Sequence, residues 1–195
     1  MRRVTLLILL GCAFAVPAGH AATGYAVGDT AVELTAPDQY GHPHRLSDYV
    51  GRWVLLDVCA AWSKPSRDMA ADAAWARPEI PFEYVACLAV GDLHVASTRG
   101  DAVKWAKRSG HRWTVLHDDG GSGALIGWLE AAGIDTIPTQ VIIGPDGMIR
   151  MIHAGYRSLQ DIYADMEELA RAARQLPPPD PWRYRAWRNL PRDPR

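Results

Sequence analysis

The sequence predicts an α/β fold, in which apolar strands alternate with helices, and three observations support this prediction. Residues 53–59 and 82–90 are nearly continuous apolar runs, as expected of strands that are covered on both faces. A helix-forming segment follows each of these runs. A strong turn signal, Gly144-Pro145-Asp146-Gly147, then lies between two strand-like segments, and a last helix-forming segment follows them.

Local signals place the elements of the first half of the chain. Residues 36–51 contain turn-forming residues between short extended stretches, so we expect an N-terminal extension of short strands and turns. Ser63 is a favoured N-cap and Pro65 suits the first turn of a helix, so a helix is expected over residues 63–76. Pro78 follows and ends that helix.

The second half alternates in the same way. A helix is expected over residues 101–109, with Gly110 as the residue that ends it. A short strand over 113–117 and a short helix over 124–132 follow. The closing elements are a hairpin over residues 139–153 and a helix whose apolar residues recur at helical spacing: Leu159, Ile162, Met166 and Leu169.

Length and composition indicate one globular domain. The chain has 195 residues, of which 48% are apolar, and this is enough for a substantial core. The formal net charge is −1, so no overall electrostatic field favours binding to nucleic acid or to an anionic membrane. A nucleic-acid partner is therefore not expected.

Residues 1–22 have the pattern of a secretory signal peptide. Met1-Arg2-Arg3 is basic, residues 4–10 form a short apolar run, and small residues accumulate up to Ala22. The apolar run is too short to span a bilayer as a mature helix. The sequence therefore predicts export to the periplasm or to another oxidising compartment, where disulfides persist.

The string Leu9-Leu10-Gly11-Cys12 offers a second interpretation of this leader. Bacterial lipoproteins end their signal with a small residue before a cysteine that becomes lipidated, and this string resembles that pattern. In that case Cys12 would anchor the mature chain in a membrane. Otherwise Cys12 is removed with the signal peptide, and no membrane contact is expected.

The strongest functional signal lies between the strand over 53–59 and its helix, in the segment Ala60-Ala61-Trp62-Ser63-Lys64-Pro65-Ser66-Arg67. This segment resembles the Trp-Cys-x-Pro-Cys segment of thioredoxin-type proteins, whose two cysteines form the reactive dithiol. Serine stands at both positions here, Ser63 and Ser66. Dithiol exchange needs a thiolate nucleophile and a second sulfur. A serine hydroxyl supplies neither, so the segment predicts a helix start from which the redox chemistry has been removed.

Two groups of motifs in the correct order resemble TlpA/redoxin-type thioredoxin-like proteins. The first group is Ala36-Pro37-Asp38, Leu46-Ser47-Asp48-Tyr49 and the segment ending at Arg67; the second is Gly133-Ile134-Asp135-Thr136-Ile137-Pro138-Thr139 and residues 142–147. The resemblance covers residues 30–172. It implies a thioredoxin-like α/β domain over residues 23–175, with a central mixed and mostly parallel sheet flanked by helices and an N-terminal β extension.

The resemblance also implies where a partner would bind. In that family a cis-proline loop faces the dithiol and helps to bind an extended substrate thiol or peptide. Ile137-Pro138 is therefore expected to face Ser63, with Pro138 in the cis form. The remaining expected partner-binding residues come from the segment before and within the helix start: Trp62, Lys64 and Pro65.

Three further residues are candidates for chemistry. Asp57 falls where thioredoxins place a buried carboxylate that assists proton transfer, and it is equally consistent with a hydrogen-bonded residue near a strand end. Cys59 and Cys87 are expected to be inert core thiols. Residues 57 and 59 share one face of a strand. If the strand over 82–90 lies alongside, Cys87 points to the same face, and a strained Cys59–Cys87 disulfide is an alternative.

Residues 176–195 differ in composition from the rest. Pro177-Pro178-Pro179 is followed by five arginines among the aromatic residues Trp182, Tyr184 and Trp187. Proline-rich polar segments rarely pack alone, which favours a flexible tail. The alternative is a docking strip for an acidic partner or for lipid headgroups.

Two functional hypotheses follow. The intact frame and the missing dithiol favour a non-catalytic module that binds a protein or peptide partner near Trp62, Ser63 and Pro138. The alternative is an atypical thiol-disulfide oxidoreductase or peroxide-reactive protein that uses Cys59, alone or with Cys87. No cofactor is expected, and no metal site, because the histidines are scattered. Exchange of both cysteines for serine is also a common way to disable a dithiol, so an engineered origin stays open.

Overall fold

The computed structural model describes residues 25–75, 82–89, 96–110, 113–118 and 124–175. The expected leader over 1–22, with Cys12, and the expected tail over 176–195 lie outside these residues. None of the described helices has both the length and the apolar content needed to cross a membrane.

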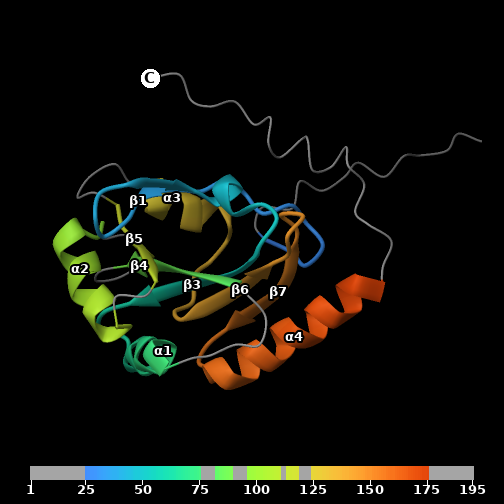
Figure 1. Ribbon diagram of the computed structural model, residues 1–195. Coiled ribbons are helices and arrows are strands. Elements are labelled where there is room, and N and C mark those ends of the chain that lie inside the picture. Colours follow the sequence, from blue (N-terminus) through green and yellow to red (C-terminus); the bar gives the residue numbers. More distant parts are fainter. Residues whose placement is uncertain (1–24, 76–81, 90–95, 111–112, 119–123, 176–195) are drawn as a thin grey trace, which may run out of the picture.

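A mixed sheet of five strands forms the centre of the molecule (Figure 1), in the order β5-β4-β3-β6-β7. β3 pairs in parallel with β4, and β4 with β5, whereas β6 runs antiparallel to both β3 and β7. The sheet is mixed as expected, but only half of its pairings are parallel. The strands are β3 (Trp53–Ala60), β4 (Phe82–Ala89), β5 (Thr114–Leu116), β6 (Thr139–Ile143) and β7 (Ile149–Ala154).

Helices cover both faces of the sheet (Figure 1). On one face lie α1 (Lys64–Trp75), α2 (Arg99–Arg108) and α4 (Leu159–Gln175), and their apolar residues share one core cluster. On the other face lies α3 (Ala124–Ala131) together with the expected N-terminal extension. The extension consists of β1 (Thr35–Pro37), β2 (Pro43–Arg45) and a 3-10 helix, η1 (Leu46–Tyr49).

The alternation of side chains along β3 divides the interior into two cores. Val54, Leu56 and Val58 face α3 and the extension, whereas Leu55 and Cys59 face α1, α2 and α4. All five side chains are buried. The nearly continuous apolar run predicted a strand covered on both faces, and the structure confirms it.

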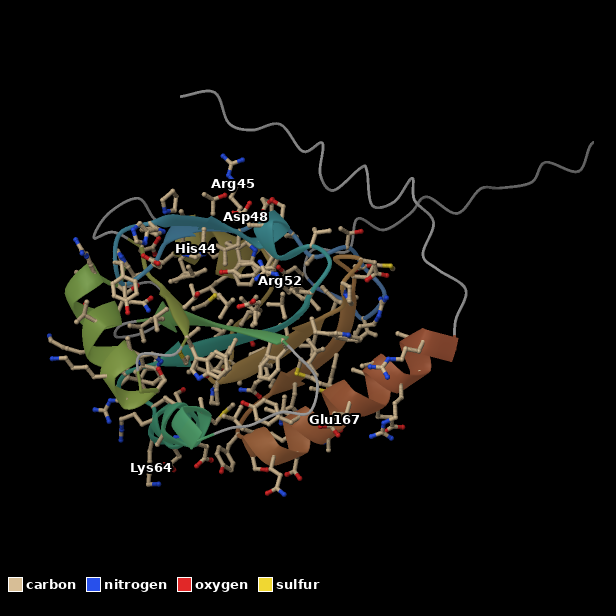
Figure 2. All side chains as sticks on the ribbon, viewed as in Figure 1. His44, Arg45, Asp48, Arg52, Lys64 and Glu167 are labelled. Carbon is tan, nitrogen blue, oxygen red and sulfur yellow. The ribbon has the colours of Figure 1, made fainter. Side chains whose placement is uncertain are left out.

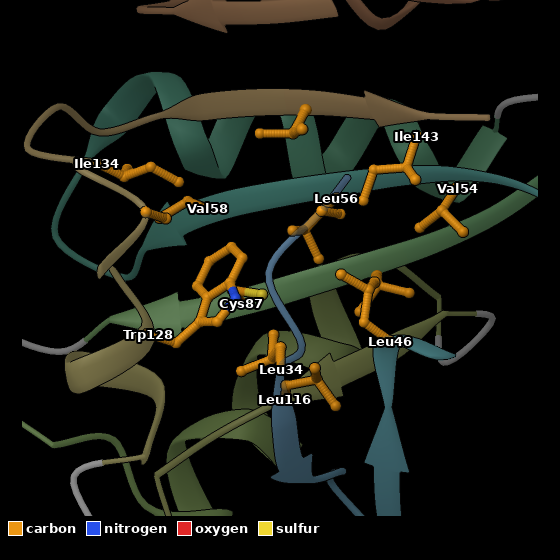
Figure 3. Packing of buried hydrophobic residues seen from close by; sticks show 14 of the residues in the cluster. Leu34, Leu46, Val54, Leu56, Val58, Cys87, Leu116, Trp128, Ile134 and Ile143 are labelled. Atoms are coloured by element: carbon orange, nitrogen blue, oxygen red, sulfur yellow. The ribbon is translucent and has the colours of Figure 1, made fainter. Parts of the chain in front are cut away.

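The N-terminal extension is part of the core. Leu34 and Leu46 are buried in the same cluster as Trp128 of α3 (Figure 3). Ala36 belongs to this cluster too. The indole N–H of Trp128 also donates to the carbonyl oxygen of Val32, at 3.1 Å. These contacts fix the extension against the sheet.

The predicted start of α2 was wrong, because the residue that caps this helix was not recognised. The helix expected from residue 101 begins at Arg99, because Thr98 is its N-cap. The Thr98 hydroxyl accepts a hydrogen bond from the Asp101 N–H, and the Asp101 carboxylate accepts one from the Thr98 N–H. This reciprocal pair is a capping box, which was not recognised in the sequence.

Candidate functional site

The two segments that were expected to face one another leave the sheet at the same edge. Val58 of β3 pairs with Thr139 of β6, which pairs in turn with Ala154 of β7. β3 runs on for two residues and leads into the helix start of α1, while Pro138 directly precedes Thr139. The Trp62–Ser66 segment and the Ile137-Pro138 loop therefore leave neighbouring strands at one end, as the resemblance implied.

The Ser63 hydroxyl is used as a helix cap. Its oxygen accepts a hydrogen bond from the Ser66 N–H at 3.3 Å, and its carbonyl accepts the Arg67 N–H at 3.1 Å. The residue is 4% exposed. α1 begins at the next residue, Lys64, so Pro65 lies in the first turn, where its missing N–H leaves no bond unmade. The predicted N-cap is confirmed.

Ser66 is buried and joins the helix start to the end of β3. Its hydroxyl oxygen accepts a hydrogen bond from the Ala60 N–H at 3.3 Å. The hydroxyl oxygens of Ser63 and Ser66 therefore both satisfy main-chain donors of the loop. This arrangement stabilises the turn from β3 into α1. Among the described residues, no base contacts either hydroxyl to activate it as a nucleophile.

Arg67 is a site residue that sequence reasoning missed. Its guanidinium donates to the carbonyl oxygens of Ala61 and Trp62, at 3.0 and 2.7 Å. These bonds hold the chain on either side of the Trp62 side chain, which is 55% exposed. Lys64 projects from α1 into solvent (Figure 2) and pairs with Asp68, at 2.5 Å. Arg67 stood at the end of the motif in the sequence, but nothing there indicated its main-chain contacts.

The Ile137-Pro138 peptide bond is cis, as the resemblance implied. The Pro138 carbonyl accepts a hydrogen bond from the Gly155 N–H at 2.7 Å, which joins this loop to the end of β7. Pro138 is buried, whereas Ile137 is only partly buried. The main-chain N–H and carbonyl of Ile137 make no hydrogen bond with other described residues.

Asp57 is fully buried between the sheet and α1. The Tyr84 hydroxyl donates to its carboxylate at 2.5 Å, and the Gln140 amide donates to its other oxygen at 3.4 Å. Burial is the dominant influence and raises the pKa of Asp57 to about 6, although both hydrogen bonds act in the opposite direction. The expectation of a buried carboxylate at this position is confirmed.

Gln140 is the second residue that sequence reasoning missed. It pairs with Asp57 across β3 and β6, and its amide nitrogen also lies 3.4 Å from the Met69 sulfur of α1. Its amide oxygen is buried without a hydrogen-bond partner among the described residues. A polar residue in the buried strand Thr139–Ile143 was the available signal, because such residues need a partner.

The expectation that Cys59 and Cys87 share a face was wrong. In the parallel register Val58 lies beside Cys87, so Cys87 faces the α3 core and Cys59 faces the opposite core. Both thiols are free and fully buried. The Cys59 thiol is 3.7 Å from the main-chain oxygen of Cys87, to which it donates. Burial raises the pKa of both thiols above the usual range, and the Asp57 charge adds to this.

No three His, Cys, Asp or Glu side chains in the described part of the chain are grouped as a metal site would require. His42 and His44 both approach the Asp38 carboxylate, at 3.5 and 3.1 Å, and form ion pairs with it when protonated. His44 also contacts the Tyr49 hydroxyl, at 2.8 Å. These contacts fasten the tip of the β1–β2 hairpin.

Residues 27–152 match the AhpC/TSA family. This chain belongs to that family. Its curated relatives include the thiol-disulfide oxidoreductase ResA of Geobacillus thermodenitrificans, which is 29% identical over 172 residues, 87% of this chain and 94% of the relative. ResA of Geobacillus kaustophilus is also 29% identical, over 75% of this chain and 80% of the relative.

Solved structures confirm the thioredoxin-like fold. A protein described as thiol:disulfide interchange protein DsbE from Chlorobium tepidum is 25% identical, with a TM-score of 0.56 over 74% of this chain and 96% of its own. The exposed lipoprotein thioredoxin Etrx1 from Streptococcus pneumoniae is 27% identical, with a TM-score of 0.55 over 70% of this chain and 99% of its own. The AhpC/TSA chain described here is therefore related to thiol-disulfide oxidoreductases.

Proposed function

We propose that this protein is a non-catalytic member of its family that binds a protein or peptide partner at the edge where Trp62 and Pro138 lie. In this proposal Ser63 and Ser66 occupy the positions of the family's dithiol. The observation that carries it is the use of both serine oxygens as acceptors for main-chain N–H groups. The loop keeps its shape through these bonds and contains no sulfur.

The binding surface in this proposal combines both loops. Trp62 supplies an exposed ring, and Lys64 and Pro65 extend the surface along the first turn of α1. Ile137 supplies a main-chain donor and acceptor that are free to pair with an extended segment, as in strand addition. Pro138 holds that loop beside β7 through its bond to Gly155.

The second candidate function is an atypical thiol-disulfide oxidoreductase or peroxide-reactive protein that uses Cys59, alone or with Cys87. Its support is the activity in the names of the curated relatives. The described geometry argues against it, because both thiols are fully buried and the pKa of each is raised. A reactive cysteine needs an accessible thiolate. The two thiols also lie on opposite faces of the sheet.

A disulfide-reduction assay separates the two functions. We expect the protein to give no turnover of insulin disulfides with dithiothreitol above the uncatalysed rate. The double variant Ser63→Cys/Ser66→Cys is expected to gain turnover, because it places two sulfurs at the helix start that follows β3, the strand that carries the buried Asp57. The single variant Ser63→Cys is the matched control, since one thiol cannot complete a disulfide cycle.

Two results would contradict the proposal. Turnover by the unmodified protein that disappears in Cys59→Ala would establish the second function. A folded Ser63→Cys/Ser66→Cys variant without turnover would show that this edge does not present the serines as a dithiol site would present its sulfurs.

We also propose that the protein is exported. The pattern of residues 1–22 supports this, and a solved relative carries "exposed lipoprotein" in its name. Lipid attachment at Cys12 is the alternative to removal of Cys12 with the signal peptide. The intact mass of the protein isolated from cell envelopes would give the cleavage site and reveal any added lipid. A mass that includes residues 1–22 unmodified would contradict export by this signal.

A further inference from the structure

A second exposed aromatic residue lies near the proposed binding surface. Tyr156 is 51% exposed, close to the 55% exposure of Trp62. Most other large aromatic side chains of the described residues pack into the two cores or against them. Tyr40 is similarly exposed, at 52%. It lies in the N-terminal extension, near the isolated bridge between Asp38 and Leu116 of β5, and so at a different part of the sheet.

The strand register places Trp62 and Tyr156 on either side of the cis-proline loop. Val58, Thr139 and Ala154 lie side by side across β3, β6 and β7. Trp62 follows the end of β3 by two residues, and Tyr156 follows the end of β7 by two residues. Adjacent strands lie about 4.8 Å apart, so β3 and β7 are separated by about 10 Å. The Gly155 N–H, beside Tyr156, is bonded to Pro138.

The charges around this edge are largely neutralised by their neighbours. Lys64 pairs with Asp68, and Arg157 pairs with Asp165. The Arg67 guanidinium is bonded to main-chain carbonyl oxygens. Asp135 is the exception, since its carboxylate accepts only the Thr136 hydroxyl among the described residues. Among the described residues, this edge therefore has no unpaired lysine or arginine to attract an acidic partner, and it has one carboxylate, that of Asp135, which repels such a partner.

We infer that Tyr156 is a binding residue that acts together with Trp62. The two rings contact an extended, uncharged peptide segment with apolar side chains. This inference rests on the proposed function and adds the chemical class of the partner. The segment crosses the cis-proline loop, where its main chain pairs with the free N–H and carbonyl of Ile137. Its apolar side chains contact the Trp62 and Tyr156 rings, which supply contact area at low cost in side-chain entropy.

The experiment selects a random peptide library displayed on phage against the immobilised full-length protein. Enriched peptides are then synthesised, and their affinities for the protein and its variants are measured by fluorescence anisotropy. The variants are Trp62→Ala, Tyr156→Ala and Tyr156→Phe, with Tyr40→Ala as the matched exposed control. Circular dichroism and thermal unfolding confirm that each variant is folded.

The expected result has three parts. Enriched peptides are rich in apolar residues and poor in charged ones, and their affinity changes little with salt concentration. Trp62→Ala and Tyr156→Ala each weaken binding by about tenfold, as for a central interface residue. Tyr156→Phe keeps the affinity because the ring face makes the contact, and Tyr40→Ala leaves it unchanged.

The possible failures are distinguishable. If Trp62→Ala weakens binding but Tyr156→Ala does not, the inference about Tyr156 is overturned and the proposed function stands. Enrichment of charged peptides whose affinity falls steeply with salt overturns the inferred partner class alone. If no peptide is enriched, or if neither variant changes the affinity, the proposed function fails together with the inference.

Discussion

At the scale of single residues, complete burial alters the chemistry of Asp57. A carboxylate normally avoids complete burial unless it is paired. Among the described residues, the partners of the Asp57 carboxylate are the Tyr84 hydroxyl and the Gln140 amide. Neither partner is charged. The folded protein therefore binds a proton at this carboxyl more tightly than the unfolded chain does, and the pKa rises to about 6.

This raised pKa predicts a pH-dependent stability. Between the ordinary aspartate pKa of about 3.9 and a pKa of about 6, the folded state binds more protons than the unfolded state. The free energy of unfolding should therefore fall as pH rises through this interval, by about 3 kcal/mol in total from this group. Urea unfolding from pH 4 to pH 8 measures this pH dependence. A variant that lacks the Asp57 carboxylate gives the contribution of the other carboxylates, which is then subtracted.

The variant for that measurement is Asp57→Asn, which removes the titration and keeps the shape. It should flatten the pH dependence and raise the free energy of unfolding above about pH 7, because an amide is less costly to bury than a carboxylate. Asp72→Asn, on the exposed side of α1, is the control. A stability difference between Asp57→Asn and the parent protein that is constant across this pH range would show that Asp57 does not titrate there.

The cysteines allow a second prediction at this scale. Cys59 and Cys87 should resist N-ethylmaleimide in the native protein at neutral pH and react rapidly once guanidinium unfolds it, because both are buried and protonated. Peptide mass mapping distinguishes them from Cys12. Labelling of native Cys59 at the rate of a free thiol would show that its pocket opens, and would favour the second candidate function.

At the scale of elements, the turn from β3 into α1 is the part of the fold that the serines serve. Four main-chain N–H groups at a helix start need acceptors, and Ser63 supplies one to Ser66. Ser66 in turn accepts from Ala60, at the last residue of β3. Both serine hydroxyls are therefore hydrogen-bond acceptors that hold the turn.

Loss of the cap should therefore destabilise the protein. We expect Ser63→Ala to lower the free energy of unfolding by about 1 kcal/mol, and Ser63→Asp to retain it, because aspartate is an equally good N-cap. Urea unfolding at neutral pH measures both. If Ser63→Ala were as stable as the parent, the hydroxyl would not be acting as the cap that the 3.3 Å contact indicates.

At the scale of the whole molecule, two cores meet at the sheet, and the N-terminal extension completes one of them. Leu34 and Leu46 belong to the extension, yet they are buried with Val58 of β3 and Trp128 of α3 (Figure 3). Among the described residues, only α3 and this extension cover that face of the sheet. We therefore expect the extension to contribute to the stability of the domain.

A core substitution tests this role. Leu34→Ala should lower the free energy of unfolding by about 2–4 kcal/mol, because it leaves a cavity against α3 and the sheet. The neighbouring Val32→Ala is the control, since Val32 is exposed and should cost no more than about 0.5 kcal/mol. Equal effects of the two substitutions in thermal or urea unfolding would show that the extension is not part of the core.

Local patterns in the sequence were sufficient for the element order, the helix start at Ser63 and the absence of sulfur at Ser63 and Ser66. Each of these depends on residues that are close in the chain, because propensity, capping and strand burial are local properties. The cis form of Pro138 was obtained from the resemblance and is confirmed by the structure. Arg67 was missed although its partners, Ala61 and Trp62, are close in the chain, because they accept through main-chain carbonyl oxygens, which every residue has. Gln140 was missed because its partner, Asp57, lies on another strand.

Only the tertiary structure decided which side chains of different strands lie on the same face of the sheet. Alternation along one strand is set by the chain, so Asp57 and Cys59 were correctly placed on one face. Whether Cys87 joined them depended on the register between β3 and β4, and a shift of one residue reverses the face. The same dependence places Tyr156 opposite Trp62 across β6. The sequence by itself determined that serine stands at positions 63 and 66. Strand pairing decided which side chains came together, because pairing joins residues that are far apart in the chain.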